Sequence, residues 1–126
     1  MKKIIFGLTL LTSMSSFADV TLSSAEGDLY NGKDAATGKA CTVQIIKFGQ
    51  DRAGRLKVYV EASISNKTIT SVLSNVGHTF RGEEPGLDGD RLYSNLFVDG
   101  NGNPQTFDLS EYNSGKTILT CDNLKK

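Results

Sequence analysis

The chain alternates apolar and polar residues over long stretches, and this period of two constrains the fold more than any other feature. The clearest run is Arg55 to Ile64, in which every second residue from Leu56 onward is apolar and the residues between are mostly polar. Successive side chains of a β-strand point to opposite faces, so this run predicts a strand that covers a core on one side. The pattern predicts an all-β protein.

Further strand-like runs follow at short intervals, separated by segments rich in Gly, Asn, Asp and Ser. We expect strands near residues 28–30, 39–48, 55–64, 68–73, 78–81, 91–98, 105–109 and 116–121. The strongest turn signal is Asp99 to Asn103, because Asp-Gly and Asn-Gly suit tight hairpins. Seven or eight short strands predict a small antiparallel β-barrel or a β-sandwich, and consecutive hairpins favour the barrel.

One predicted strand, residues 39–48, is apolar on both faces. Cys41, Val43 and Ile45 share one face, whereas Ile46 and Phe48 fall on the other. The alternation therefore predicts a strand that is partly covered on both sides.

The first 18 residues have the layout of a secretory signal peptide. Lys2 and Lys3 precede the apolar run 4–11, and a polar stretch then ends at Ala18. The apolar run is shorter than the roughly 20 residues of a membrane-spanning helix. We expect cleavage after Ala18, a single exported β domain of residues 19–126 in the periplasm or medium, and no stable membrane insertion after cleavage.

Export determines how the two cysteines, Cys41 and Cys121, are interpreted. An exported chain meets an oxidising compartment, so we expect one disulfide between them, with their α-carbons within about 7 Å. Two cysteines and the single His78 provide neither the number nor the spacing of ligands that a zinc site needs. The predicted disulfide brings an early strand next to the last one.

Overall composition excludes several classes of function. The chain has 14 basic and 14 acidic residues, and 38% of its residues are hydrophobic. A balanced charge excludes a basic nucleic-acid binder, and the apolar content excludes a disordered acidic tail. Loss of Lys2 and Lys3 would leave a small acidic excess in the mature chain.

Two segments imitate ligand-binding motifs without meeting their requirements. In Asn31 to Ala40 the glycines of a phosphate-binding loop are one residue too far apart, so we expect a surface loop there. The calcium-loop spacing that begins at Asp99 has Pro104 where the required glycine belongs, so we expect a hairpin turn. We predict no cofactor and no metal.

The sequence also gives little support for catalysis. His78 is the only histidine, and no serine lies in a nucleophile-elbow motif. A disulfide would consume both thiols, and the absence of Trp removes one common platform for sugars. We therefore predict no catalytic residues, and a hydrolase is the least favoured function.

The segment Arg81 to Arg91 is the most distinctive in the chain. It holds four acids and two arginines among three glycines and a proline; the charged residues are Arg81, Glu83, Glu84, Asp88, Asp90 and Arg91. Because Gly and Pro disfavour regular strands, we expect the longest exposed loop here, and its acids make it a candidate site for a basic protein partner. The alternative is a solvated loop whose charges prevent aggregation.

Two binding functions follow from these observations. In the first, the protein is a protein-interaction or inhibitor-like module that uses its loops, including 81–91. In the second, it is a lipocalin-like carrier of a small apolar ligand. The second function requires a cavity among the predicted interior residues, which include Val43, Val58, Val60, Leu96 and Phe107.

Overall fold

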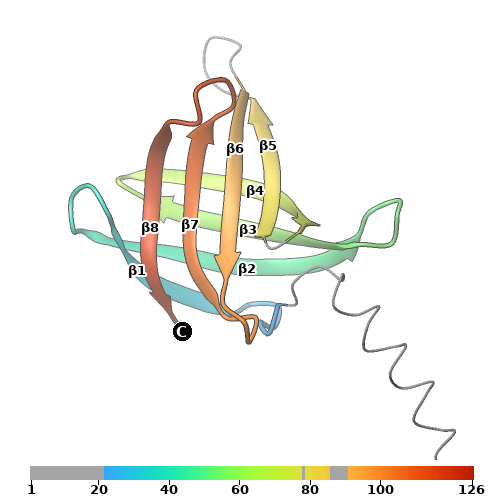
Figure 1. Cartoon of the computed structure of the whole chain (residues 1–126). Helices are drawn as coiled ribbons and strands as arrows, with labels where there is room; N and C mark the ends of the chain where they lie inside the picture. The colour runs from blue at the N-terminus through green and yellow to red at the C-terminus, as the bar shows by residue number, and fades with distance from the viewer. Residues whose placement is uncertain (1–21, 78, 86–90) are drawn as a thin grey trace, which may run out of the picture.

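A computed structural model describes residues 22–77, 79–85 and 91–126, which form a closed barrel of eight antiparallel strands (Figure 1). Each strand pairs with the next one, and β8 pairs with β1. The strands are β1 (Leu29–Asp34), β2 (Ala40–Gln50), β3 (Leu56–Ile64), β4 (Lys67–Val76), β5 (Thr79–Pro85), β6 (Arg91–Val98), β7 (Pro104–Glu111) and β8 (Thr117–Lys125). The predicted all-β class is confirmed, and of the two predicted architectures the structure has the favoured one, the barrel. No helix in the described part of the chain could cross a membrane.

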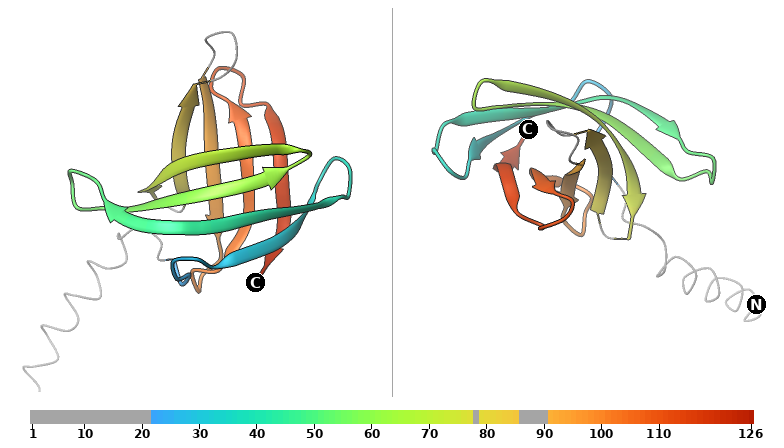
Figure 2. Two further views of the ribbon diagram at one scale, coloured as in Figure 1. Left: turned by 180° about the vertical axis from the view of Figure 1, so that it is seen from behind. Right: turned by 90° about the horizontal axis from the view of Figure 1, so that it is seen from above.

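The barrel consists of two halves that cross one another, β1–β4 and β5–β8 (Figures 1 and 2). The halves meet at two seams, and each seam has only three paired positions. At the first, β1 pairs with β8 through a register shift between Asn31 and Lys33. At the second, residues 74–76 of β4 pair with residues 79–81 of β5.

The disulfide between Cys41 and Cys121 crosses the β1–β8 seam, which we therefore call the linked seam. The bond joins β2 to β8, and the two α-carbons lie 5.9 Å apart, as predicted. Gly32 of β1 lies between them in the register, opposite Cys41. A Cβ on Gly32 would collide with the backbone oxygen of Asp122, so only glycine fits this crossing. The β4–β5 seam has no crosslink, and we call it the open seam.

Alternate residues of the strands fill the interior of the barrel. In β3 the predicted inward residues from Val58 to Ile64 are buried, while Glu61 and Ser63 are exposed. Phe80, Leu96 and Phe107 form a cross-strand row that is fully buried. The period-two pattern thus predicted the inward residues of β3 correctly.

A β-bulge in β2 explains its two apolar faces. The register with β3 shifts between Ile45 and Lys47, which leaves Ile46 42% exposed. After the shift Phe48 pairs with Val58 and packs against the core. The prediction of a strand covered on both sides was wrong, because one extra residue returns Phe48 to the inner face.

The prediction that Asn31–Ala40 is a surface loop over its whole length was also wrong. Its first four residues belong to β1, and Asp34 is only 2% exposed. The carboxylate of Asp34 accepts hydrogen bonds from the backbone N–H of Ala36 and from the hydroxyl of Ser65. Asp34 therefore joins the end of β1 to the turn between β3 and β4.

Candidate functional site

The distinctive segment 81–91 is only partly a loop. β5 extends to Pro85 and β6 begins at Arg91, so Glu83 and Glu84 occupy paired strand positions opposite Tyr93 and Leu92. The prediction of one long loop was therefore wrong for Arg81 to Pro85 and for Arg91. Asp88 and Asp90 lie outside the described residues.

The glycine and the proline of β5 are compatible with a strand because of where they lie. A Cβ on Gly82 would collide with the backbone oxygen of Val72, so glycine allows β5 to approach β4 closely. Pro85 is the last residue of β5, where a missing N–H interrupts little pairing. Gly82 lies just beyond the last β4–β5 pair, and Pro85 ends β5. Both residues are therefore compatible with a strand and do not require a loop.

Arg81, Glu83 and Arg91 come together with two tyrosines on the outer surface of β5 and β6. The guanidinium of Arg81 lies 4.5 Å from the ring centre of Tyr93, and that of Arg91 lies 6.0 Å from the ring centre of Tyr112. The two tyrosine rings are 5.1 Å apart, and Arg91 forms an exposed ion pair of 3.8 Å with Glu83. We call these five residues the arginine–tyrosine patch.

A short polar chain holds the patch on the sheet. The Nε–H of Arg81 donates to the Asn95 side-chain oxygen at 2.8 Å, and the Asn95 amide donates to Asp108 at 2.9 Å. Asn95 is buried although it lies on the outer surface, because its neighbours cover it. These two hydrogen bonds hold the Arg81 guanidinium over the Tyr93 ring.

Two pKa values in this region are shifted by their surroundings. Loss of solvent raises the pKa of Tyr93 above its ordinary value, and the neighbouring Tyr112 and Glu83 raise it further. Burial also raises the pKa of Asp108, against the lowering effects of the Asn95 amide and the Arg81 charge. Both shifts follow from the packing of these side chains against one another on the outer surface of the sheet.

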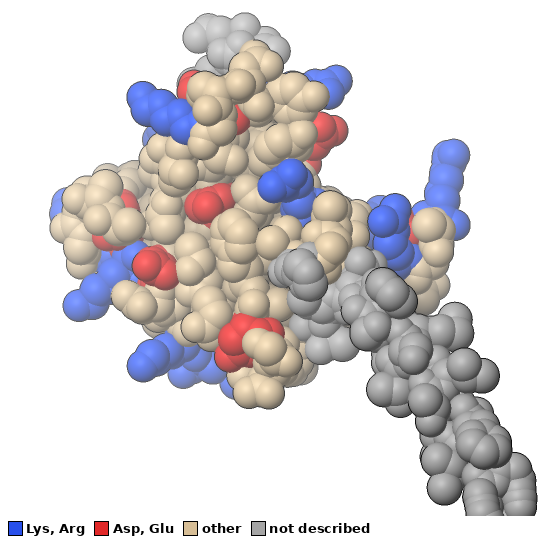
Figure 3. All heavy atoms as spheres, viewed as in Figure 1, with Lys and Arg blue, Asp and Glu red and all other residues tan. Residues whose placement is uncertain are grey.

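A small cavity of about 110 Å³ adjoins the patch. Arg91, Glu111, Tyr112, Asn113 and Ser114 line it, and Ser114 donates a hydrogen bond to Glu111 at 2.7 Å. Figure 3 shows basic and acidic side chains interspersed on this face of the molecule, without a large area of one sign. The surface can therefore provide local charged contacts but no broad electrostatic field.

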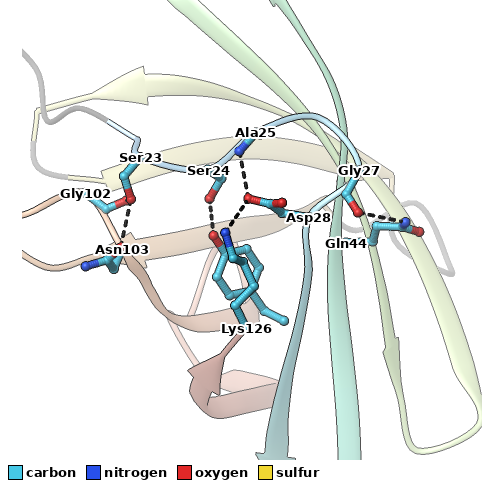
Figure 4. Close-up of polar contacts among 10 residues, drawn as sticks. Ser23, Ser24, Ala25, Gly27, Asp28, Gln44, Gly102, Asn103 and Lys126 are labelled. Carbon is cyan, nitrogen blue, oxygen red and sulfur yellow. Dashed lines mark hydrogen bonds and ion pairs between the residues drawn. The ribbon is translucent and has the colours of Figure 1, made fainter.

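The opposite end of β6 is covered by residues 22–28, which we call the strap (Figure 4). The backbone N–H of Ser23 donates to the carbonyl of Gly102 at 2.9 Å, and the Ser24 and Tyr30 hydroxyls form a buried hydrogen bond of 2.6 Å. Gly27 and Asp28 exchange backbone hydrogen bonds with Ile45 of β2. The strap therefore closes this end by joining the β6–β7 turn to β2.

The strap end also carries a shallow polar cavity of about 330 Å³. Several of its polar groups are already occupied within the protein. The hydroxyl of Ser23 donates to Asn103 at 2.8 Å, and Lys126 forms an ion pair of 3.3 Å with Asp28. The backbone N–H of Ala25 is the main cause of the lowered pKa of Asp28. These contacts hold the strap against the C-terminus and the β6–β7 turn.

The calcium-like turn is stabilised by its own backbone. The Asp99 carboxylate accepts hydrogen bonds from the N–H groups of Asn101 and Asn103 at 2.8 and 2.9 Å, which lowers its pKa. These bonds support the predicted hairpin turn. Within the described ranges, no group of three or more His, Cys, Asp or Glu residues could hold a metal ion. His78 lies outside those ranges.

The tyrosines and their support were not among the residues singled out from the sequence. Alternation in β6 does place Tyr93 and Asn95 on the face opposite Leu96, and this pattern indicates that both lie on the outer surface. Nothing in the sequence, however, indicates that Tyr112 from the next hairpin lies beside Tyr93. No protein-family model, curated protein or solved structure matches this chain.

Proposed function

We propose that the protein is an exported protein-binding module, inhibitor-like in its mode of action, that contacts its partner through the arginine–tyrosine patch. The observation that carries the proposal is the stacking of Arg81 and Arg91 on Tyr93 and Tyr112 beside an exposed glutamate. Tyr and Arg are the residues that contribute most often to strong protein contacts. Tyr112 is 45% exposed and can still lose much surface on binding.

The rigid support of the patch adds to this proposal. Arg81 is fixed through Asn95 and Asp108, and the rings of Tyr93 and Tyr112 contact one another. Side chains that are ordered before binding lose less conformational entropy when a partner arrives. The disulfide is compatible with an oxidising compartment, where an exported module would meet that partner.

Site-specific crosslinking tests the proposal. A photoreactive residue replaces exposed Asn113 beside the patch, or exposed Glu61 on β3 as the control position. In extracts of the source cells and medium, we expect a defined crosslinked protein from position 113 and none of that mass from position 61. Equal labelling from both positions, or none from either, would contradict the patch as the binding surface.

Substitutions separate the patch from general surface effects. Arg91→Ala combined with Tyr112→Ala should abolish the crosslink from position 113. Tyr59→Ala is the matched control, because Tyr59 on β3 also lies under cations, with Lys47 Nζ at 4.7 Å and Lys57 Nζ at 5.8 Å from its ring centre. The control variant should crosslink like the unmodified protein.

The carrier function receives no support from a specific observation. The five predicted interior residues, Val43, Val58, Val60, Leu96 and Phe107, are all fully buried and pack within a single cluster. Side chains that fill a barrel leave no room for an apolar ligand. We therefore propose recognition at the outer surface rather than in the interior.

A further inference from the structure

One side of β4 has an unpaired stretch. β4 pairs with β3 from Lys67 to Ser74, but it pairs with β5 only over residues 74–76. Among the described residues, no strand pairs with the other side of β4 from Lys67 to Leu73. The open seam therefore leaves a free strand edge.

The close approach at Gly82 shows which backbone groups point to this edge. The carbonyl oxygen of Val72 lies only 2.5 Å from the position that a Cβ of Gly82 would occupy, so it faces β5 and away from β3. Backbone groups alternate in direction along a strand, so those of Thr70 and Thr68 also point away from β3. Both threonines are exposed. Their N–H and C=O groups form the hydrogen-bonding part of the free edge.

The edge lacks the features that usually prevent strand addition. Proteins protect such edges with proline, bulges or charged residues. The stretch from Lys67 to Ser71 contains no proline and has its one charge at the end, and its pairing with β3 has no register shift. The facing part of β5, in contrast, contains two glutamates and ends in Pro85.

The surface beside the edge would contact one face of an added strand. The ends of β5 to β8 next to the patch project beyond β4 (Figures 1 and 2). Leu92 and Leu119, on the inner face of these strands, are only partly buried, as is Ile69 of β4. Glu111, paired with Leu92, adds a partly exposed carboxylate on the same face.

We propose that the β4 edge from Lys67 to Ser71 binds an extended segment of another protein as an added strand. The segment carries alternate apolar residues that face the partly buried Ile69, Leu119 and Leu92, and a Lys or Arg that reaches Glu111. A second copy of the chain does not fit this edge. If two β4 edges pair antiparallel, they are related by a two-fold axis perpendicular to the sheet, so the projecting ends of both copies would collide on the same face. This inference does not depend on the arginine–tyrosine patch.

Selection of peptides followed by amide exchange tests the proposal directly. A random heptapeptide library displayed on phage is selected against the disulfide-bonded protein, and an enriched peptide is synthesised. We expect enriched sequences to alternate apolar residues and to contain Lys or Arg. On addition of this peptide, NMR should show slowed exchange of the Thr68 and Thr70 amides, while those of Ile69 and Ser71 are already protected by β3.

Two variants separate the edge from the patch. Thr70→Pro removes an N–H at the free edge and no hydrogen bond to β3, and it should weaken peptide binding by about tenfold. Tyr112→Ala should leave the affinity for the peptide unchanged. The exchange pattern is measured on the unmodified protein, so it decides the question even if Thr70→Pro does not fold.

Several results would overturn the proposal. They are a library without enriched peptides, a peptide that leaves the exchange of Thr68 and Thr70 unchanged, and equal affinity for the folded Thr70→Pro variant. Loss of peptide binding in Tyr112→Ala would move the site to the patch. Protection of Thr68 and Thr70 without peptide, together with a dimer that dissociates on dilution, would identify a second copy as the occupant.

Discussion

The two seams of the barrel both join its two halves, but they are stabilised differently. Each joins the two halves through three paired positions, and each requires a glycine where a Cβ would collide with the neighbouring backbone, Gly32 at one and Gly82 at the other. The linked seam adds the disulfide, and the open seam adds no crosslink. We therefore expect the linked seam to maintain the closed barrel, whereas at the open seam the β4 edge from Lys67 to Leu73 has no partner strand among the described residues.

The largest expected effect is loss of the crosslink at the linked seam. The variant Cys41→Ala with Cys121→Ala should lower the free energy of unfolding by about 4 kcal/mol, because the disulfide closes a long loop in the unfolded chain. The residues it joins are 80 positions apart. Equilibrium unfolding in urea measures this change. An unchanged midpoint and slope would mean that strand pairing alone holds the seam.

The two glycines test whether the linked seam is the more rigid one. Gly32→Ala and Gly82→Ala should each destabilise the protein by about 1–3 kcal/mol through overpacking against a backbone oxygen. We expect the larger loss for Gly32, because the disulfide prevents β8 from moving away. Urea unfolding of both variants gives the comparison.

Reduction of the disulfide provides the control for this pair. The difference between the two glycine variants should become smaller when the measurement is repeated under reducing conditions. A larger loss for Gly82→Ala in the oxidised protein would contradict the assignment of the rigid seam.

Asp34 at the linked seam should make stability depend on pH. The hydroxyl of Ser65 lowers the pKa of Asp34 below its ordinary value of 3.8, and the Ala36 N–H lowers it further. A lowered pKa in the folded state contributes stability that is present above the ordinary value and is lost as the pH falls through the folded value. Asp34→Asn should therefore be destabilising at pH 7.

The pH profile distinguishes this effect from simple loss of packing. The difference in free energy of unfolding between the protein and Asp34→Asn should diminish as the pH is lowered from 5 to below the ordinary pKa. Urea titrations across this range measure it. A difference that is constant with pH would show that the charge of Asp34 is not the stabilising feature.

The smallest expected effect on stability is at Tyr112 of the arginine–tyrosine patch, because this residue belongs to neither seam. Tyr112→Ala should change the free energy of unfolding by less than about 0.5 kcal/mol, because this side chain is exposed and outside the core. Thermal unfolding measures the change. A large loss of stability would mean that the tyrosine pair serves the fold rather than a partner.

Part of the candidate site could be predicted from the sequence. The composition of segment 81–91 identified Arg81, Glu83 and Arg91 as candidates, since charges clustered among Gly and Pro are conspicuous in one dimension. Tyr93 and Tyr112 could not be grouped with them, because their contact depends on how the β6–β7 hairpin pairs and where the next turn folds back. The free edge of β4 could not be predicted either, because alternation predicts a strand but not the extent of its pairing with each neighbour.

The sequence by itself determined the all-β class, the inward residues of β3, the main turns and the pairing of its two cysteines, because each follows from local periodicity or from a single available partner. Only the tertiary structure decided the bulge at Ile46, the strand character of Arg81 to Pro85 and the difference between the two seams. These features arise where separate strands approach one another closely. Such contacts depend on register and on the positions of backbone atoms from distant parts of the chain, and local patterns do not encode them.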